Sequence, residues 1–262
     1  MKKTLVSFAA VAGFALVSCG TTTPTTWEAI ENRGYVIVGL DDTFAPMGFR
    51  DSNNEIVGFD VDLAKLVFAT LDIEVRFQPI EWGAKVLELD AGNIDMIWNG
   101  LTITEPRRLE MLFSDPYINN RQVVLTRFTD TIDTLAELTT LKVGVQSTSA
   151  SEAIVEETLT FTGDGELLGF DTFNLALAAL TAETVDAVVI DEIMGRYIIA
   201  QQPNTYRVMT EDFGDEQYGI GFRLANDTIR DTVNDTLFDL IASGDATEIS
   251  ETWFAEDILV RS

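Results

Sequence analysis

The sequence of 262 residues contains no histidine and only one cysteine, Cys19. Without histidine, Ser-His-Asp and Cys-His nucleophile systems cannot form, and zinc sites of the usual His/Cys type are excluded. No segment matches a P-loop, and no GxGxxG motif follows a predicted strand, so the usual phosphate-binding loops are missing. We therefore expect no cofactor, no metal ion and no enzymatic activity.

Basic residues are also scarce: Lys plus Arg number 17 against 43 Asp plus Glu, a net charge of −26. Such a sequence has no basic stripe to displace counterions from phosphates, which argues against nucleic acid, and it disfavours electrostatic adsorption to anionic lipid. A hydrophobic content of 46% and an aromatic content of 10% still indicate a globular fold. We expect a soluble, acidic monomer.

The N-terminal segment has the pattern of an export signal. Two lysines are followed by an apolar stretch, residues 4–18, that is too short for a comfortable membrane span. Leu16-Val17-Ser18-Cys19 resembles the bacterial lipobox, in which the cysteine is lipidated; the alternative is an ordinary signal cleaved near Ser18. The pattern predicts a signal at residues 1–18, a lipidated polar tether at residues 19–26, and a membrane-anchored protein on the extracellular or periplasmic face.

Short apolar runs typical of buried strands alternate with helical patterns along the rest of the chain. The predicted strands cover residues 35–40, 72–77, 94–100, 141–146 and 185–192. Helical spacing of apolar residues predicts a helix over 58–71 and another from Ile229 to Ile241, with Gly244 as its stop. This alternation indicates an α/β fold with parallel strands.

Parallel α/β sheets bind ligands beyond the carboxyl ends of their strands. The residues that follow the predicted strands are polar and of mixed charge: Asp41, Asp42, Thr43 and Phe44; Thr102, Thr104 and Arg107; Ser147, Thr148 and Ser149; and Asp191. We expect the ligand site among them.

Arg107 is a scarce positive charge in a strand-to-helix turn, GLTITEPRR (100–108). Thr104 is a suitable N-cap for a short helix, with Leu109 and Leu112 beginning its apolar face. A guanidinium beside a helix start can hold a carboxylate through two hydrogen bonds, and Thr102 could donate a third. The alternative is a surface arginine paired with an acid on its own helix, which fits Arg108 better than Arg107.

Asp191 is the complementary charge, because a carboxylate at the end of an apolar strand is costly to bury unless it meets a cation. A ligand's α-ammonium would serve, and an Asp opposite an Arg fits the two poles of an amino acid; an N-cap for the next helix is a compatible alternative. Phe44 and Trp82 stand at loop starts, where they could form the wall of a ligand site or pack in the core.

These motifs together resemble the extracellular solute-binding proteins of polar amino-acid ABC importers. The resemblance runs in order from about residue 35 to residue 254, and it rests on GFDVDLA (58–64) and on TITEPRR followed by FSDPY (113–117), supported by LKVGVQ, VDAVVIDE and QYGIGF. It implies a two-lobed, periplasmic-binding-protein-like fold of type II, with two crossover strands forming a hinge. The implied lobes are residues 27–123 plus 219–262 and residues 127–215, with crossovers near 123–127 and 215–219.

The resemblance also assigns ligand contacts to positions in this sequence. Arg107, with Thr102 and the backbone of Gly100, takes the carboxylate-binding position, and Asp191 takes the ammonium-binding position. The aromatic walls fall on Phe44 and Trp82, and the positions that touch the ligand side chain fall on Asp41, Asn99 and Gln146. Ser149 occupies a threonine position of the family, whereas Thr148 stands where many members carry glycine, which puts the backbone geometry there in doubt.

The sequence therefore predicts a protein that binds an extracellular L-amino acid and delivers it to an ABC importer permease. The polar side-chain positions favour a polar or cationic ligand, with arginine or glutamine as the leading candidates. Two alternatives remain: a dehydratase-type enzyme on the same scaffold and a ligand-sensing module of a receptor.

Overall fold

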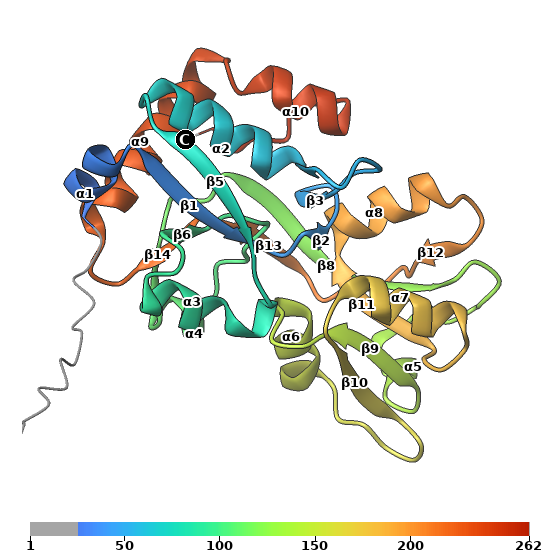
Figure 1. Ribbon diagram of the computed structural model, residues 1–262. Coiled ribbons are helices and arrows are strands. Elements are labelled where there is room, and N and C mark those ends of the chain that lie inside the picture. Colours follow the sequence, from blue (N-terminus) through green and yellow to red (C-terminus); the bar gives the residue numbers. More distant parts are fainter. Residues whose placement is uncertain (1–25, 262) are drawn as a thin grey trace, which may run out of the picture.

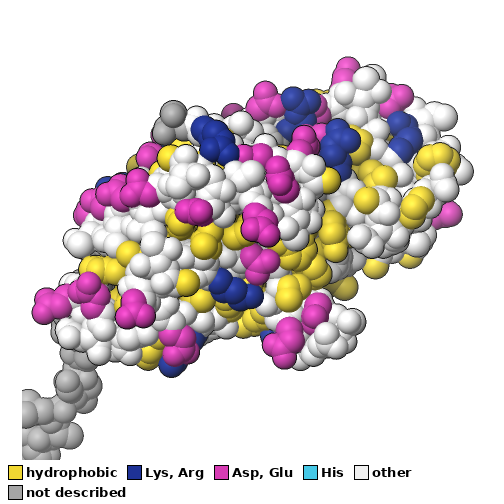
Figure 2. Space-filling model, turned by 90° about the horizontal axis from the view of Figure 1, so that it is seen from above, with side chains coloured by type: hydrophobic (Ala, Val, Ile, Leu, Met, Phe, Trp, Pro, Cys, Tyr) yellow, Lys and Arg dark blue, Asp and Glu magenta, His cyan; other side chains and the backbone are white. Residues whose placement is uncertain are grey.

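The computed structural model describes residues 26–261, which form two lobes joined by paired strands (Figure 1). The predictions of a signal, a lipidated Cys19 and most of the tether lie outside these residues. Among the helices that are described, none combines the length and apolar character needed to cross a bilayer. Figure 2 shows acidic side chains spread over the visible face rather than gathered in one patch.

The first lobe is built around a five-stranded sheet with the strand order β5-β1-β6-β14-β7. Its strands are β1 (Tyr35–Leu40), β5 (Glu74–Pro79), β6 (Met96–Ile97), β7 (Met111–Phe113) and β14 (Gly221–Arg223). Its helices are α1 (Trp27–Arg33), α2 (Phe59–Thr70), α3 (Lys85–Ala91), α4 (Glu105–Arg108), α9 (Asp227–Ser243) and α10 (Thr247–Phe254), with the 3₁₀ helix η1 at Trp82–Ala84. A small sheet of β2 (Thr43–Phe44), β3 (Gly48–Arg50) and β4 (Ile56–Val57) lies beside α2.

The second lobe is built around the strand order β10-β9-β11-β8-β12, with β13 paired to β8. Its strands are β8 (Ile118–Arg127), β9 (Lys142–Gln146), β10 (Glu166–Phe170), β11 (Ala187–Asp191), β12 (Tyr206–Val208) and β13 (Asp215–Tyr218). Its helices are α5 (Leu135–Leu138), α6 (Ala150–Thr158), α7 (Phe173–Thr181) and α8 (Glu192–Gln201).

Strands β8 and β13 connect the two lobes. Residues 118–121 of β8 pair antiparallel with β13, and residues 122–125 pair with β11 of the second sheet. After β13 the chain returns to the first sheet through β14, and α9 and α10 then pack against α2 (Figure 1). The exact boundaries of the lobes stay a prediction.

The α/β class is confirmed, and both sheets are mixed, with antiparallel strands added to the parallel ones. The predicted strands pair in parallel, as β1 does with β5 and β6 and as β9 does with β10 and β11. Two strands run against them, β8 in the second sheet and β14 in the first, whereas β12 pairs antiparallel with β8 and so runs in the same direction as β11. The chain passes to the second lobe along β8 and returns along β13, and β8 and β14 each enter their sheet against the direction of their neighbours.

Element bounds follow the apolar patterns closely where a glycine or a buried face sets them. Strand β1 covers the predicted residues, and α9 ends at Gly244, whose φ of 89° allows the left-handed C-cap. Strand β5 begins two residues later than predicted, after Asp72 in a turn with φ 57°. Only two residues of the run 94–100 form a strand, and its last three form a loop that reaches the cavity described below.

Candidate functional site

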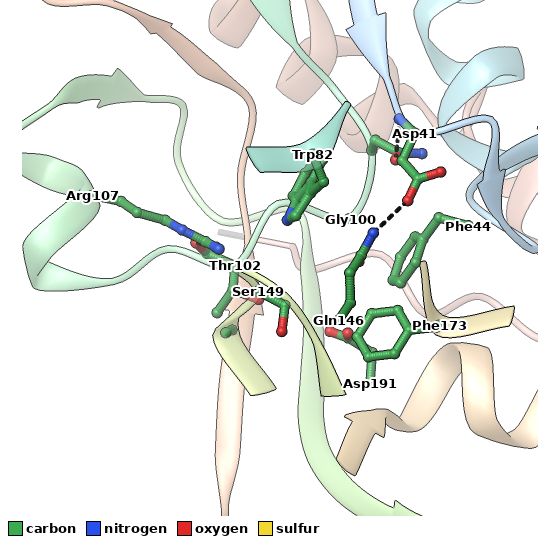
Figure 3. A pocket seen from close by; sticks show the side chains of 12 residues that line it. Asp41, Phe44, Trp82, Gly100, Thr102, Arg107, Gln146, Ser149, Phe173 and Asp191 are labelled. Carbon is green, nitrogen blue, oxygen red and sulfur yellow. Dashed lines mark hydrogen bonds between the residues drawn. The ribbon is translucent and has the colours of Figure 1, made fainter. Parts of the chain in front are cut away.

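One small cavity lies between the lobes and is lined by all ten residues assigned from the sequence. The space between its walls, part of it open to solvent, is about 280 Å³. The lining residues are Asp41, Phe44, Trp82, Asn99, Gly100, Thr102 and Arg107 from the first lobe, and Gln146, Ser149, Ala150, Phe173 and Asp191 from the second (Figure 3). Ala150 and Phe173 were missed by the sequence analysis.

Arg107 reaches this cavity from the short helix α4. As expected, Thr104 caps the helix by accepting a hydrogen bond from the Arg107 N–H, at 3.3 Å. The predicted apolar face of α4 is wrong, because the helix ends at Arg108 and Leu109 is 80% exposed. The two arginines separate as expected: Arg107 is buried, whereas Arg108 is exposed and pairs with Glu105 at 3.6 Å.

The guanidinium of Arg107 is bound by backbone carbonyls of both lobes. Its Nη1 donates to the Thr102 carbonyl at 2.8 Å, and its Nη2 donates to the Thr148 carbonyl at 3.3 Å. Burial lowers the pKa of Arg107, although the charges of Glu216 and Asp191 act in the opposite direction. Within the described part of the chain, Arg107 makes no ion pair. The geometry therefore presents a buried positive charge whose compensation by a carboxylate is incomplete.

Thr148 adopts a backbone conformation that glycine adopts more readily than other residues. Its φ is 60°, in the left-handed region that a β-branched residue rarely adopts. The turn directs its carbonyl toward the first lobe, where Lys85 Nζ donates to it at 3.1 Å alongside Arg107. This turn is formed at the cost of strain on Thr148.

Ser149 caps the N-terminus of α6 beside Arg107. Its hydroxyl oxygen accepts a hydrogen bond from the Glu152 N–H at 3.1 Å, which leaves the hydroxyl hydrogen available to a ligand. A helix N-terminus carries a partial positive charge, so Ser149 and Arg107 form one end of the cavity that favours an anion.

Lys85 is a second buried cation near this anion-favouring end. Its ammonium group donates to the carbonyls of Trp82 and Thr148, both at 3.1 Å, and lies 5.0 Å from the centre of the Trp82 ring. Burial, and then the nearby Arg107 guanidinium, lower the pKa of Lys85 to about 7. Because Lys85 belongs to the first lobe and Thr148 to the second, this contact joins the lobes.

Asp191 ends β11 on the other side of the cavity and is buried. It stands at the N-cap position of α8, but its side chain makes no capping hydrogen bond. Its Oδ1 instead accepts hydrogen bonds from Asn120 Nδ2 at 2.8 Å, from Gln122 Nε2 at 3.0 Å and from the Tyr218 hydroxyl at 2.7 Å. Burial, followed by the neighbouring Glu216, raises the pKa of Asp191 well above its usual range.

A buried aspartate, Asp60, shapes the loop between these two charges. Its carboxylate accepts from the Gly100 N–H at 2.6 Å and from the Tyr117 hydroxyl at 2.8 Å, and burial raises its pKa to about 7. The Gly100 N–H is therefore not a free donor for a ligand carboxylate. A Cβ on Gly100, which has φ 57°, would approach the Phe44 ring to 2.7 Å, so this position favours glycine.

The far end of the cavity is polar on one side and aromatic on the other. Asp41 Oδ1 accepts from the N–H and hydroxyl of Thr43, and Asp41 Oδ2 accepts from Gln146 Nε2 of the other lobe at 2.8 Å (Figure 3). The rings of Phe44 and Phe173 face each other across the lobes at 5.9 Å. This end offers a carboxylate, amide groups and an apolar wall.

Three comparisons with known proteins, two of sequence and one of structure, point to one family. Residues 36–256 match the model of "Bacterial extracellular solute-binding proteins, family 3". The chain is 26% identical over 231 residues to the L-cystine-binding protein TcyJ of Escherichia coli, covering 87% of this chain and 86% of that protein.

Solved structures are similar over most of the chain. An ABC uptake transporter substrate-binding protein from Streptococcus pneumoniae, with bound histidine, is 34% identical, with a TM-score of 0.86 over 90% of this chain and 98% of that one. An ancestral arginine-binding protein bound to glutamine is 36% identical, with a TM-score of 0.79 over 86% of this chain and 99% of that one. The chain therefore belongs to family 3 of the bacterial extracellular solute-binding proteins, which bind amino acids for ABC uptake and are not enzymes.

Proposed function

We propose that this protein binds an L-amino acid with a polar or cationic side chain, with arginine or glutamine favoured, and delivers it to an ABC importer permease. One observation carries the proposal: Arg107 and Asp191, two buried residues of opposite charge, line one cavity from opposite lobes. An α-amino acid carries a carboxylate and an ammonium group on one carbon, so it complements both charges at once. Each lobe alone holds one of the two.

The carboxylate of the ligand would lie at the end formed by Arg107 and Ser149. The Arg107 guanidinium, the free hydroxyl hydrogen of Ser149 and the N-terminus of α6 all favour an anion there. Micromolar affinity corresponds to roughly 8 kcal/mol, which two charge-assisted poles and an aromatic wall can supply.

The side chain of the ligand would lie against Asp41, Asn99 and Gln146. Asp41 makes no ion pair among the described residues, and its carboxylate can accept further hydrogen bonds from a guanidinium or an amide. Asn99 Nδ2 is buried without an acceptor in the described structure, and a glutamine carbonyl oxygen would provide one. The uncompensated Asp41 favours arginine, and the unpaired Asn99 amide favours glutamine.

The lobes would close on the ligand about the crossover strands. The proposed division is residues 27–123 with 219–262 for one lobe and residues 127–215 for the other. The contacts between Asp41 and Gln146 and between Lys85 and Thr148 then form only when the lobes close. Hinge closure of this kind places part of the specificity in contacts that both lobes make together.

A thermal-shift and calorimetric screen of the twenty amino acids with ornithine and cystine tests the proposal. We expect stabilisation by arginine or glutamine, and no stabilisation by any ligand would contradict it. Asp41→Asn should weaken arginine far more than glutamine, because only the cation loses a charge partner. The matched control is Asp42→Asn, since Asp42 pairs with Arg50 outside the cavity, and it should leave both affinities unchanged.

We further propose that a lipid on Cys19 anchors the protein. The support is the sequence alone: a basic start, an apolar stretch and Leu16-Val17-Ser18-Cys19. Cys19→Ala should release the protein from membranes without changing its amino-acid affinity, which fractionation and calorimetry measure. Equal membrane retention of the variant would contradict the anchor and leave the binding site untouched.

A further inference from the structure

Two carboxylates, those of Asp191 and Glu216, share the same two amide donors. Asn120 Nδ2 lies 2.8 Å from Asp191 Oδ1 and 2.6 Å from Glu216 Oε1. Gln122 Nε2 lies 3.0 Å and 2.9 Å from the same two oxygens. The carboxylates therefore face each other across a pair of neutral amides.

These groups stand on the strands that connect the lobes. Asn120 and Gln122 belong to β8, and Glu216 belongs to β13, its partner strand. Asp191 lines the cavity, and Glu216 does not. Glu216 accepts a hydrogen bond from the Thr102 hydroxyl at 2.9 Å. Glu216 thus sits between the proposed ammonium position and the first lobe, without lining the cavity itself.

The donors around the two carboxylates carry no charge. Besides the amides they are the hydroxyls of Tyr218, to Asp191, and Thr102, to Glu216. The hydroxyl of Tyr117, the residue before β8, donates to Asp60 rather than to Asp191 or Glu216. The charge of Arg107 interacts with both carboxylates, but its hydrogen bonds go to carbonyl groups.

The remaining charges on the adjoining elements have partners of their own. Glu192, which follows Asp191, pairs with Arg196 at 2.5 Å, and Asp215, which precedes Glu216, pairs with Arg121 at 2.6 Å. Two close carboxylates with neutral donors repel each other, and one of them binds a proton more readily than usual.

We propose that Asp191 and Glu216 hold one proton between them in the ligand-free protein, and that the ammonium group of the amino acid displaces it. This inference rests on the proposed function. On binding, the O–H bond of the shared proton breaks and the proton passes to the solvent, while the ammonium keeps its three hydrogens and donates to Asp191. Glu216 is then a positioning residue that acts through Asp191.

The direction of the pH dependence follows from the raised pKa of Asp191 in the ligand-free site. A bound ammonium stabilises the ionised carboxylate, so binding lowers that pKa. Proton release makes the affinity rise with pH until the ligand-free Asp191 is itself ionised, and fall by up to about tenfold per unit as the pH decreases below that point.

Calorimetry with L-arginine, in two buffers of different ionisation enthalpy at pH 7, measures the number of protons released. Lys85 can mask the effect, because its lowered pKa lets it take up a proton when a carboxylate arrives. The titration is therefore repeated in Lys85→Met, where we expect release of close to one proton, about the limit for a single shared site. L-glutamine serves as a second probe.

Glu216→Gln keeps the size of the side chain and removes the second carboxylate, so release in the Lys85→Met background should fall below that of Lys85→Met alone, while the burial of Asp191 remains. Asp215→Asn removes one acid from the same strand outside the network and should leave release unchanged. The inference would be overturned if Lys85→Met released the same number of protons with and without Glu216→Gln. It would also be overturned if Lys85→Met released no proton on binding.

Loss of ligand binding has a different meaning in the Glu216→Gln variant and in the unmodified protein. If Glu216→Gln does not bind L-arginine, the pH dependence of affinity in Lys85→Met decides, with a flat profile contradicting the shared proton. If neither L-arginine nor L-glutamine binds the unmodified protein, the proposed function fails with the inference, whereas binding without proton release contradicts the inference alone.

Discussion

The two charged ends of the cavity are built in different ways. Arg107 is held by carbonyls from both lobes, Thr102 and Thr148, so its surroundings are complete only in the closed form. Asp191 is held by Asn120, Gln122 and Tyr218 on the connecting strands, none of which has to cross the cavity. The contrast suggests a preformed ammonium end and a carboxylate end that closure completes.

Loss of the Arg107 guanidinium should have the largest effect on binding. Arg107→Ala leaves the ligand carboxylate buried without its cation, which costs about 2–5 kcal/mol, or roughly 30-fold or more in affinity. Calorimetry should show this loss, and urea denaturation should show a folded protein. Arg108→Ala is the matched control, because Arg108 is exposed, and it should bind normally. Normal binding by Arg107→Ala would contradict the assignment of the carboxylate end.

Lys85→Met tests whether the carboxylate end depends on closure. The variant loses the hydrogen bond from Lys85 to the Thr148 carbonyl, which joins the lobes and is worth about 1 kcal/mol, so every ligand should bind about fivefold more weakly with unchanged ratios between ligands. Stopped-flow fluorescence should assign the loss to faster dissociation. Lys65→Met, at an exposed position on α2, should change nothing. A change in the order of ligand preference would mean that Lys85 contacts the ligand itself.

Thr148→Gly should have the smallest effect, and it should be on stability. Relief of the left-handed strain is worth about 1–3 kcal/mol, and the added freedom of glycine in the unfolded chain offsets about 0.5–1 kcal/mol. We expect a melting temperature that rises by a few degrees, while the carbonyl that binds Arg107 remains. Asn204→Gly is the control, since Asn204 has φ 64° and asparagine tolerates that region. No gain over this control would show that Thr148 is not strained.

The sequence predicted the fold and the cavity residues well where apolar runs end in polar ones. The rule of reading strand ends found Asp41, Thr102, Arg107, Ser149 and Asp191, which line one cavity in the structure. Phe173 was missed because β10, a strand that precedes it, was not recognised, although the same rule would have pointed there.

Other features left no pattern to read. The connecting strands alternate polar residues that point inward, Asn120, Gln122 and Glu216, with more exposed polar residues. The sequence there is therefore polar, as in a surface segment. Asn120 and Gln122 are buried and Glu216 is half-buried only because segments distant in sequence pack around them. The end of α4 at Arg108 and the exposure of Leu109 likewise depend on how β7 turns back into the sheet, which helical spacing does not encode.

The central claim is that one cavity binds both poles of an amino acid, and blocked ligands test it most directly. Calorimetry should compare L-arginine with agmatine, which lacks the carboxylate, and with N-acetyl-L-arginine, which lacks the ammonium group, and L-glutamine with its methyl ester and N-acetyl forms. We expect each blocked form to bind at least about 30-fold more weakly than its parent, because each leaves Arg107 or Asp191 without its partner. Equal affinity of either kind of blocked form and its parent would contradict the claim.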